Sequence, residues 1–192
     1  MAKDPTQNSV GGSRLSLNES VAEELATHGA EEAPQAFYDL LVPYMRQAMK
    51  LTQTEPSSRP VRDRHFSDRH PVDGPANELD DVLLRAAAAA VRKLAVSDQQ
   101  VSHKVLEVLA ADPHDAAQWL LYEGLRMDGE RWAEWTSSLL LEGSQRLTSG
   151  YVENPFWTTR MLLQATTPYM KEEPLRSLEH QILQLRPARE SR

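Results

Sequence analysis

The sequence contains no cysteine, and this absence removes several kinds of chemistry at once. Without thiols the chain cannot form disulfides, a thiolate zinc site, an iron–sulfur cluster or a cysteine nucleophile. Glycine-rich phosphate loops are missing as well, since neither G-x-x-x-x-G-K-[ST] nor G-x-G-x-x-G occurs. We therefore expect no bound cofactor and no site that hydrolyses a nucleotide or binds a dinucleotide.

Long apolar runs and an excess of positive charge are also lacking. The first 20 residues have no apolar core of the kind found in signal peptides, and the run from Leu83 to Leu94 is too short to span a bilayer. These features predict a cytoplasmic protein that does not contact a membrane. The formal net charge of -7 disfavours bulk attraction to nucleic acid, although local basic patches could still provide it.

Helical periodicity is what the sequence does have, along most of its length. After Asn77, apolar residues recur at spacings of three and four over four turns, and five alanines occupy positions 86–90. No segment alternates with a period of two over a useful length. With 192 residues, the chain is about one domain long. These patterns predict an all-α fold.

Two stretches in the second half repeat each other 42 residues apart. Asp112-Pro113 opens one helical pattern and Asn154-Pro155 opens another, and each reaches a Leu-Leu pair at the same distance. A second helical pattern follows each of them. Helical hairpins of this length are typical of stacked repeats such as HEAT units. We therefore predict either a short HEAT-like solenoid or an irregular helical bundle.

Local signals place the expected helix ends. Ser20 and Gly29 should start and stop the first helix, Pro43 should kink the second or end it early, and Asp112 should cap a later helix. The second helix, starting at Pro34, carries large apolar residues at helical spacing: Phe37, Leu40, Leu41, Tyr44, Met45 and Met49. The chain accordingly divides into a disordered lead-in (1–17), an N-terminal helical pair (18–51), a Pro/Arg/His-rich loop or linker (52–75), a helical repeat domain (76–186) and a polar tail (187–192).

The loop of residues 59–73 is the densest functional-looking stretch and admits three functional interpretations. As a protein-contact surface, it offers Arg62, Arg64, His65 and Arg69. As a nucleic-acid patch, the arginines from Arg59 to Arg69 would contact phosphates while Phe66 stacks on a base. As a metal centre, the ligands would be His65, Asp68, His70 and Asp73.

Each interpretation of this loop has a simpler rival. No recognised metalloenzyme spacing is present, so a solvated loop outweighs a metal site and we expect no bound metal. Asp63, Asp68 and Asp73 cancel much of the positive charge. The arginines can instead pair with these aspartates, or with acidic helix ends, and hold the loop on the surface.

A second candidate surface lies around residues 151–160. Tyr151, Phe156 and Trp157 flank a loop and the start of the next helix, beside Arg160. Aromatic and arginine side chains together are typical of interface hot spots, but they also seal the ends of helical stacks. His114, between two aspartates, could form an Asp–His pair for general-base chemistry, although acidic residues favour helix starts for electrostatic reasons alone.

Three stretches resemble the helical region of large bacterial ATP-binding STAND-type proteins, which are associated with defence against phage. The stretches are residues 59–66, 110–121 and 154–163, and the resemblance covers about residues 34–186. It implies a helical platform that senses a ligand or transmits a state to an NTPase module. The NTPase motifs themselves do not occur in this sequence.

The sequence thus favours a non-catalytic, α-helical module that binds a protein, with an NTPase module in cis or in trans as one partner that the resemblance implies. Its predicted surface combines the 59–73 loop with the aromatic loop. A nucleic-acid-binding protein that uses the same arginines is the alternative, and a metal-dependent hydrolase ranks below it. Whether residues 18–51 pack on residues 76–186 is a question for the structure.

Overall fold

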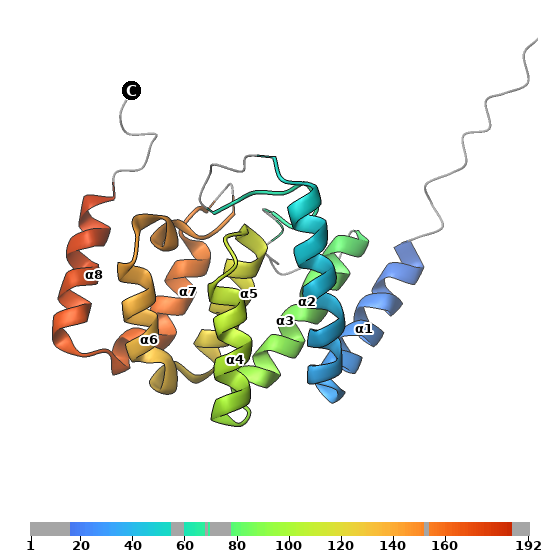
Figure 1. The fold of residues 1–192 in the computed structure, drawn as a ribbon, viewed down its shortest axis with the longest axis horizontal. Coiled ribbons are helices and arrows are strands. Elements are labelled where there is room, and N and C mark those ends of the chain that lie inside the picture. The colour runs from blue at the N-terminus through green and yellow to red at the C-terminus, as the bar shows by residue number, and fades with distance from the viewer. Residues whose placement is uncertain (1–15, 55–59, 68, 70–77, 152–153, 186–192) are drawn as a thin grey trace, which may run out of the picture.

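The structure, a computed structural model, describes residues 16–54, 60–67, 69, 78–151 and 154–185 (Figure 1). Most of the predicted lead-in, the polar tail, and Arg59, Asp68, His70 and Asp73 lie outside the described residues. The described chain has no strand, only three isolated β-bridges. Its α-helices are α1 (Ser16–Glu32), α2 (Pro34–Leu51), α3 (Leu79–Ala95), α4 (Gln99–Ala110), α5 (Asp115–Leu125), α6 (Gly129–Leu141), α7 (Trp157–Thr166) and α8 (Glu172–Gln184). The prediction of an all-α fold is confirmed.

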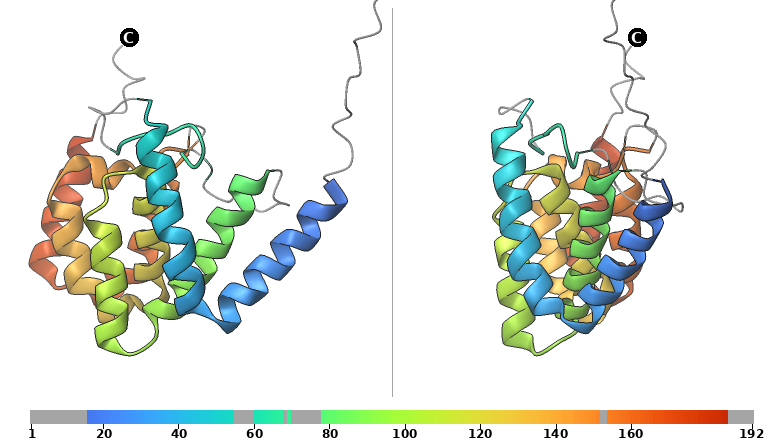
Figure 2. Two further views of the ribbon diagram at one scale, coloured as in Figure 1. Left: turned by 45° about the vertical axis from the view of Figure 1, so that its right-hand side comes forward. Right: turned by 90° about the vertical axis from the view of Figure 1, so that its right-hand side faces the viewer.

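The helices pack in a row, and α3 lies between α1 and α2 at one end (Figure 2). Contacts run from α1 to α3, from α3 to α5 and from α5 to α7, while α6 packs against α7 and α8. The first two helices therefore pack directly on the later ones. α5 and α7 begin 42 residues apart, as the sequence echo does. Membership of a repeat family stays a prediction.

The centre of the row contains two fully buried kinds of side chain, the small alanines of α3 and the large residues of α5. All five alanines at positions 86–90 of α3 are buried, which lets neighbouring helices approach closely. α5 is buried along its whole length, from Asp115 to Leu125. Its Trp119 and Tyr122 are each 1% exposed and are among the largest fully buried side chains. The core thus centres on α3 and α5, as the alanine-rich pattern predicts for α3.

Three local predictions about the ends of the first two helices were wrong. α1 begins at Ser16, before the predicted start at Ser20. α1 continues past Gly29 to Glu32, and a Cβ at Gly29 would lie 2.7 Å from Cζ of Phe37, so this glycine accommodates the neighbouring ring. α2 continues through Pro43 to Leu51. A proline inside a helix costs about 3 kcal/mol. The buried face of α2 offsets this cost, because it packs a regular series of side chains into the core: Tyr38, Leu41, Val42, Met45 and Met49.

Glu123 joins three elements through a buried ionic clamp. Its carboxylate is 3% exposed and accepts hydrogen bonds from Arg92 of α3, including one of 2.7 Å from Nε. Arg126, in the 3-10 turn after α5, donates from Nε at 2.8 Å and from Nη2 at 2.7 Å. Hydrogen bonds from two arginines compensate the cost of burying the charge. The clamp therefore fixes α5 against α3.

Gly129, the first residue of α6, marks the closest approach of α6 to α7. A Cβ at this position would overlap the carbonyl group of Ala165. Gly129→Ala should therefore lower the free energy of unfolding by about 1–3 kcal/mol, because backbone on both sides must move. Chemical denaturation would measure this loss.

Gly143→Ala is the matched control for Gly129→Ala. The three atoms nearest to a Cβ at Gly143 would all belong to the side chain of Gln145, which is exposed and can move aside. The backbone of Gly143 is extended, with φ of 179°, so any residue can adopt it. Its variant should stay within about 0.5 kcal/mol of the wild type. Equal losses in the two variants would contradict the proposed backbone overlap.

Candidate functional site

Connecting segments gather at one end of the helix row, which we call the loop end (Figure 1). There, the segment of residues 60–67 docks on the connection between α4 and α5. The Val61 amide donates to the Pro113 carbonyl at 2.8 Å, and the Asp115 amide donates to the Val61 carbonyl at 3.0 Å. Val61 is only 3% exposed. The described part of this loop is therefore packed against the helices.

Asp63 organises this segment from within. Its carboxylate accepts hydrogen bonds from the amides of His65 at 2.8 Å and Phe66 at 2.7 Å, and from the hydroxyl of Ser67 at 2.9 Å. The resulting turn directs the ring of Phe66 into the core, where it is 1% exposed. The prediction of Phe66 as a stacking platform for a base was therefore wrong, because the ring is already covered by protein.

Two basic residues of the loop contact the acidic start of α3. Arg69 pairs with Glu78 at 2.5 Å and with Asp81 at 3.0 Å, at the acidic start of α3. Burial would lower the pKa of Arg69, but the bonds to these two carboxylates outweigh it and raise the pKa. His65 lies 3.0 Å from Asp80 of the same helix start. These contacts match the interpretation in which acidic helix ends hold the loop. Arg62 and Arg64, like His65, are exposed.

The aromatic loop occupies the neighbouring part of the loop end. Tyr151, Phe156 and Trp157 are each partly buried, and the rings of Tyr151 and Trp157 lie 6.1 Å apart at 59°. Arg160 is exposed on the first turns of α7. These aromatic side chains cover the start of α7 and are also partly exposed. Their burial fits a sealed helix end, and their exposed part fits an interface hot spot.

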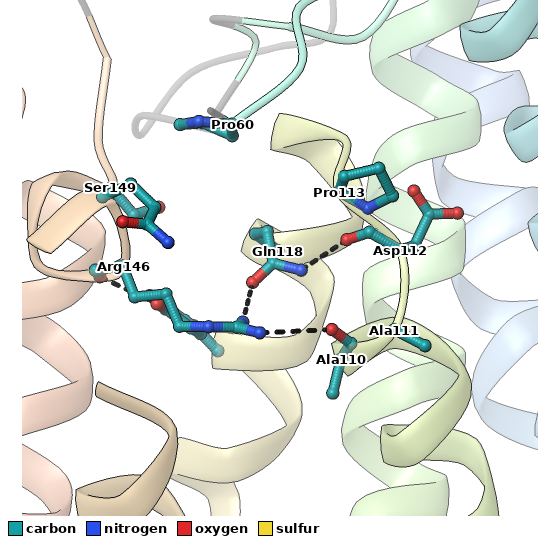
Figure 3. Close-up of a pocket in the computed structure, with 10 residues that line it drawn as sticks. Pro60, Ala110, Ala111, Asp112, Pro113, Gln118, Arg146 and Ser149 are labelled. Atoms are coloured by element: carbon teal, nitrogen blue, oxygen red, sulfur yellow. Dashed lines mark hydrogen bonds between the residues drawn. The ribbon is translucent and has the colours of Figure 1, made fainter. Parts of the chain in front are cut away.

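A small pocket lies between the two loops (Figure 3). It has a volume of about 210 Å³. Pro60, next to Val61, borders one side, and Ser149, next to the aromatic loop, borders another. None of the eight predicted interaction residues lines it. Its walls come from the α4–α5 connection, α5 and the segment after α6: Pro60, Ala110, Ala111, Asp112, Pro113, Gln118, Tyr122, Gln145, Arg146 and Ser149.

Gln118 and Arg146 brace the pocket by hydrogen bonds (Figure 3). The guanidinium of Arg146 donates to Oε1 of Gln118 and to the Ala110 carbonyl at 3.4 Å, and it pairs with Glu142 at 3.0 Å. The Gln118 amide donates to the Asp112 carbonyl at 2.5 Å. Each group is held by several partners. The pocket is therefore formed in advance of any ligand.

Tyr122 holds the backbone of Arg146 in place at the pocket wall. Its hydroxyl donates to the Arg146 carbonyl at 2.8 Å. Burial, opposed by nearby Arg146, raises the pKa of Tyr122, so the phenol remains protonated and continues to donate. This bond fixes the backbone that carries the Arg146 side chain.

Ser149 contributes the one lining hydroxyl that lacks a hydrogen-bond partner among the described residues. The residue is 3% exposed. A buried hydroxyl without a partner costs about 1–3 kcal/mol, and this oxygen is itself shielded from the pocket's open space. Sequence patterns did not single out Gln118, Arg146 or Ser149. The available signal was weak, namely Gln118 as a polar residue inside an otherwise apolar helical pattern.

Asp112 and His114 form a buried pair beside this pocket. Oδ1 of Asp112 lies 2.6 Å from Nδ1 of His114 and accepts from the His114 amide at 3.1 Å, while Oδ2 accepts from Nε of Arg46 at 2.6 Å. Nε2 of His114 lies 3.0 Å from the Gln53 amide nitrogen. Protein groups therefore contact both ring nitrogens. Because α5 begins at Asp115 after His114, the prediction of Asp112 as its cap was wrong.

The described residues include only one of the four proposed metal ligands. This ligand is His65, and its nearest carboxylate is the ion-pair partner Asp80. No group of three or more potential ligands occurs within the described ranges. In that same part of the chain, no helix has the length and apolar character that a membrane span requires.

Comparison with known proteins gives no identification. No family model matches the chain, and no curated protein or solved structure matches it either.

Proposed function

We propose that this chain is a non-catalytic helical module that binds a protein partner at its loop end. The observation that carries the proposal is the preformed pocket at the loop end, braced by the contacts of Arg146 with Gln118, Ala110 and Glu142. A rigid scaffold that presents loops around a concavity is the usual arrangement of a recognition surface.

The chemistry of the pocket favours a segment that carries acidic or amide side chains. The guanidinium N–H groups of Arg146, which lines the pocket, are donors, so an entering group should offer oxygen acceptors. Around the pocket's end of the molecule, Arg62, Arg64 and Arg160 are exposed. Exposed arginines at a rim steer an acidic partner and align it.

The resemblance to STAND-type proteins extends this proposal to the kind of partner. An NTPase module, supplied in cis or in trans, would then bind the loop end and pass its state to the helical platform. The same resemblance would place the chain in a bacterial defence system. Both statements rest on the three resembling stretches and not on the pocket.

Two of the residues predicted to contact nucleic acid are engaged within the protein. Phe66 is buried, and Arg69 is committed to Glu78 and Asp81. Arg62 and Arg64 are the exposed arginines of the described part of this loop. If nucleic acid is the ligand, affinity should fall steeply with salt, because neutralised phosphates release counterions.

The loop end can be tested by affinity capture from the native host, followed by titration of the captured partner with purified protein. Arg62→Ala/Arg64→Ala should weaken binding about tenfold, and Ser149→Leu should do the same by filling the pocket. Arg176→Ala is the matched control, because Arg176 is an exposed arginine on α8. Equal affinity of the partner for all three variants and the wild type would reject the loop end as the binding surface.

A further inference from the structure

Arg146 supplies the positive charge on the wall of the pocket at the loop end. Two of the residues that line this pocket are charged, Arg146 and Asp112. The Asp112 carboxylate is 3% exposed, accepts hydrogen bonds from Arg46 and His114, and points away from Arg146 (Figure 3). The Arg146 side chain is 17% exposed. The pocket therefore presents one positive charge to a group that enters it.

The guanidinium of Arg146 is held in a fixed orientation. Its N–H groups donate to Oε1 of Gln118 and to the Ala110 carbonyl at 3.4 Å. Its backbone carbonyl accepts from the hydroxyls of Tyr122 at 2.8 Å and Thr159 at 3.1 Å. A guanidinium carries five N–H donors in a planar fork, so these side-chain bonds leave further donors for a ligand. Because backbone and side chain are both fixed, those donors are oriented before a ligand arrives.

A carboxylate of the chain itself already pairs with this fork. Oε2 of Glu142 lies 3.0 Å from Nη2 of Arg146, and the Glu142 side chain is 57% exposed. Glu142 directly follows α6, one turn before Arg146. An ion pair with such an exposed member contributes little free energy, because water screens it and a mobile side chain must be ordered. Glu142 can therefore leave Arg146 at small cost when another carboxylate competes for it.

We propose that the pocket is a carboxylate site, in which Arg146 binds an acidic group of the partner and Glu142 is a built-in competitor that this group displaces. The proposal rests on the proposed binding of a protein at the loop end and names the chemistry of the contact. The carboxylate comes from an acidic side chain or from a chain terminus.

The charge and the shape of the site both match a carboxylate. One guanidinium fits the single charge and the two coplanar oxygens of this group. A phosphate dianion would keep an uncompensated negative charge, in a chain whose net charge is already -7. The apolar part of the wall, which includes Pro60, Pro113 and the ring of Tyr122, accommodates the carbon stem of the entering group.

Three small probes distinguish the sources of the carboxylate in NMR titrations of the whole chain. A glutamate blocked at both ends carries only a side-chain carboxylate, and N-acetylalanine carries only a terminal one. A glutamine blocked at both ends is the neutral control. Side-chain signals of Arg146 and Gln118 report binding. At least one carboxylate should bind about tenfold more tightly than the blocked glutamine, and the tighter of the two identifies the source.

Variants of the ion pair test the two roles, and α8 offers a matched control pair. Arg146→Gln should weaken binding of the carboxylate probe about tenfold or more. Glu142→Gln should tighten it about threefold, because the competitor is removed and Arg146 stays in place. A purely structural role of Glu142 would not improve affinity. Glu172 and Arg176 form an exposed pair with the same spacing, so Glu172→Gln and Arg176→Gln should leave binding unchanged.

Three results would overturn the carboxylate site: no carboxylate probe binds, the blocked glutamine binds as tightly as the carboxylates, or Glu142→Gln fails to tighten binding. The last result decides the matter even if Arg146→Gln does not fold. If affinity capture of a partner still depends on Arg62 and Arg64, such a failure rejects the carboxylate site alone. Tight binding of a carboxylate probe, together with capture that ignores every loop-end variant, would instead reject the proposed protein-binding function.

Discussion

Glu123→Ala should lower the free energy of unfolding by about 3–5 kcal/mol. The change removes the carboxylate that both Arg92 and Arg126 contact, and it leaves two neighbouring guanidinium groups without their shared acceptor. Because Glu123 is 2% exposed, water cannot replace the lost bonds without opening the packing between α3 and α5. Chemical denaturation at neutral pH, with a check that the dependence on denaturant is unchanged, would measure the loss.

Glu123→Gln tests how much of the stability loss comes from the charge of this side chain and how much from its shape. The amide fills the same space and keeps one oxygen acceptor, so we expect a loss smaller than that of alanine, about 1–3 kcal/mol. Equal losses for the two variants would assign the whole effect to charge. A loss below about 1 kcal/mol for Glu123→Ala would show that the clamp contributes little net stability.

Asp112→Asn should lower the free energy of unfolding by about 2–4 kcal/mol at neutral pH, because it neutralises a buried acceptor of three hydrogen bonds. Arg46 would lose its ionic partner, and the ring of His114 would lose the carboxylate that orients it. Arg176→Ala, which breaks an ion pair between two exposed residues of α8, provides a comparison near zero.

The effect of Asp112 should depend on pH in a defined direction. Burial acts to raise the pKa of Asp112, but hydrogen bonds from the His114 side chain and backbone and from Arg46 outweigh it, and the pKa is lowered. The carboxylate therefore contributes its stability above the unfolded-state pKa of about 3.9 and loses it as the pH falls through the lower folded-state value. The difference between wild type and Asp112→Asn should persist to about pH 4 and shrink below it. Unfolding measured across a pH series would contradict this if the difference vanished between pH 7 and pH 5.

Local sequence signals predicted most helices because the same residues that favour each helix also pack it. At the start of α4, for example, the carboxylate of Asp98 accepts a hydrogen bond from the Gln100 amide at 2.9 Å. Gly29 and Pro43 misled the prediction because both are helix breakers in isolation. Packing decided these positions, since Phe37 needs the space beside Gly29 and the inner face of α2 is buried on both sides of Pro43.

The candidate site was only partly accessible from the sequence. The pattern drew attention to the 59–73 loop and to the aromatic loop, and Pro60 of the first loop lines the pocket. The role of both loops in binding stays a prediction. Gln118 and Arg146 were missed because their contact joins α5 to the turn after α6, and no periodic pattern signals such a pair. Phe66 was misplaced because the turn around Asp63, which buries the ring, depends on side-chain hydrogen bonds within the loop.

The full burial of α5 has a consequence for how the protein unfolds. In a linear stack, units that contact only their neighbours can melt separately from either end. Here α5 contacts α3 and α4 on one side and α6 and α7 on the other, and Glu123 ties it to α3. Loss of α5 would remove the packing partner of both halves together. The middle of the row should therefore melt in a single cooperative transition, and fraying should be confined to α1 and α8 at its ends.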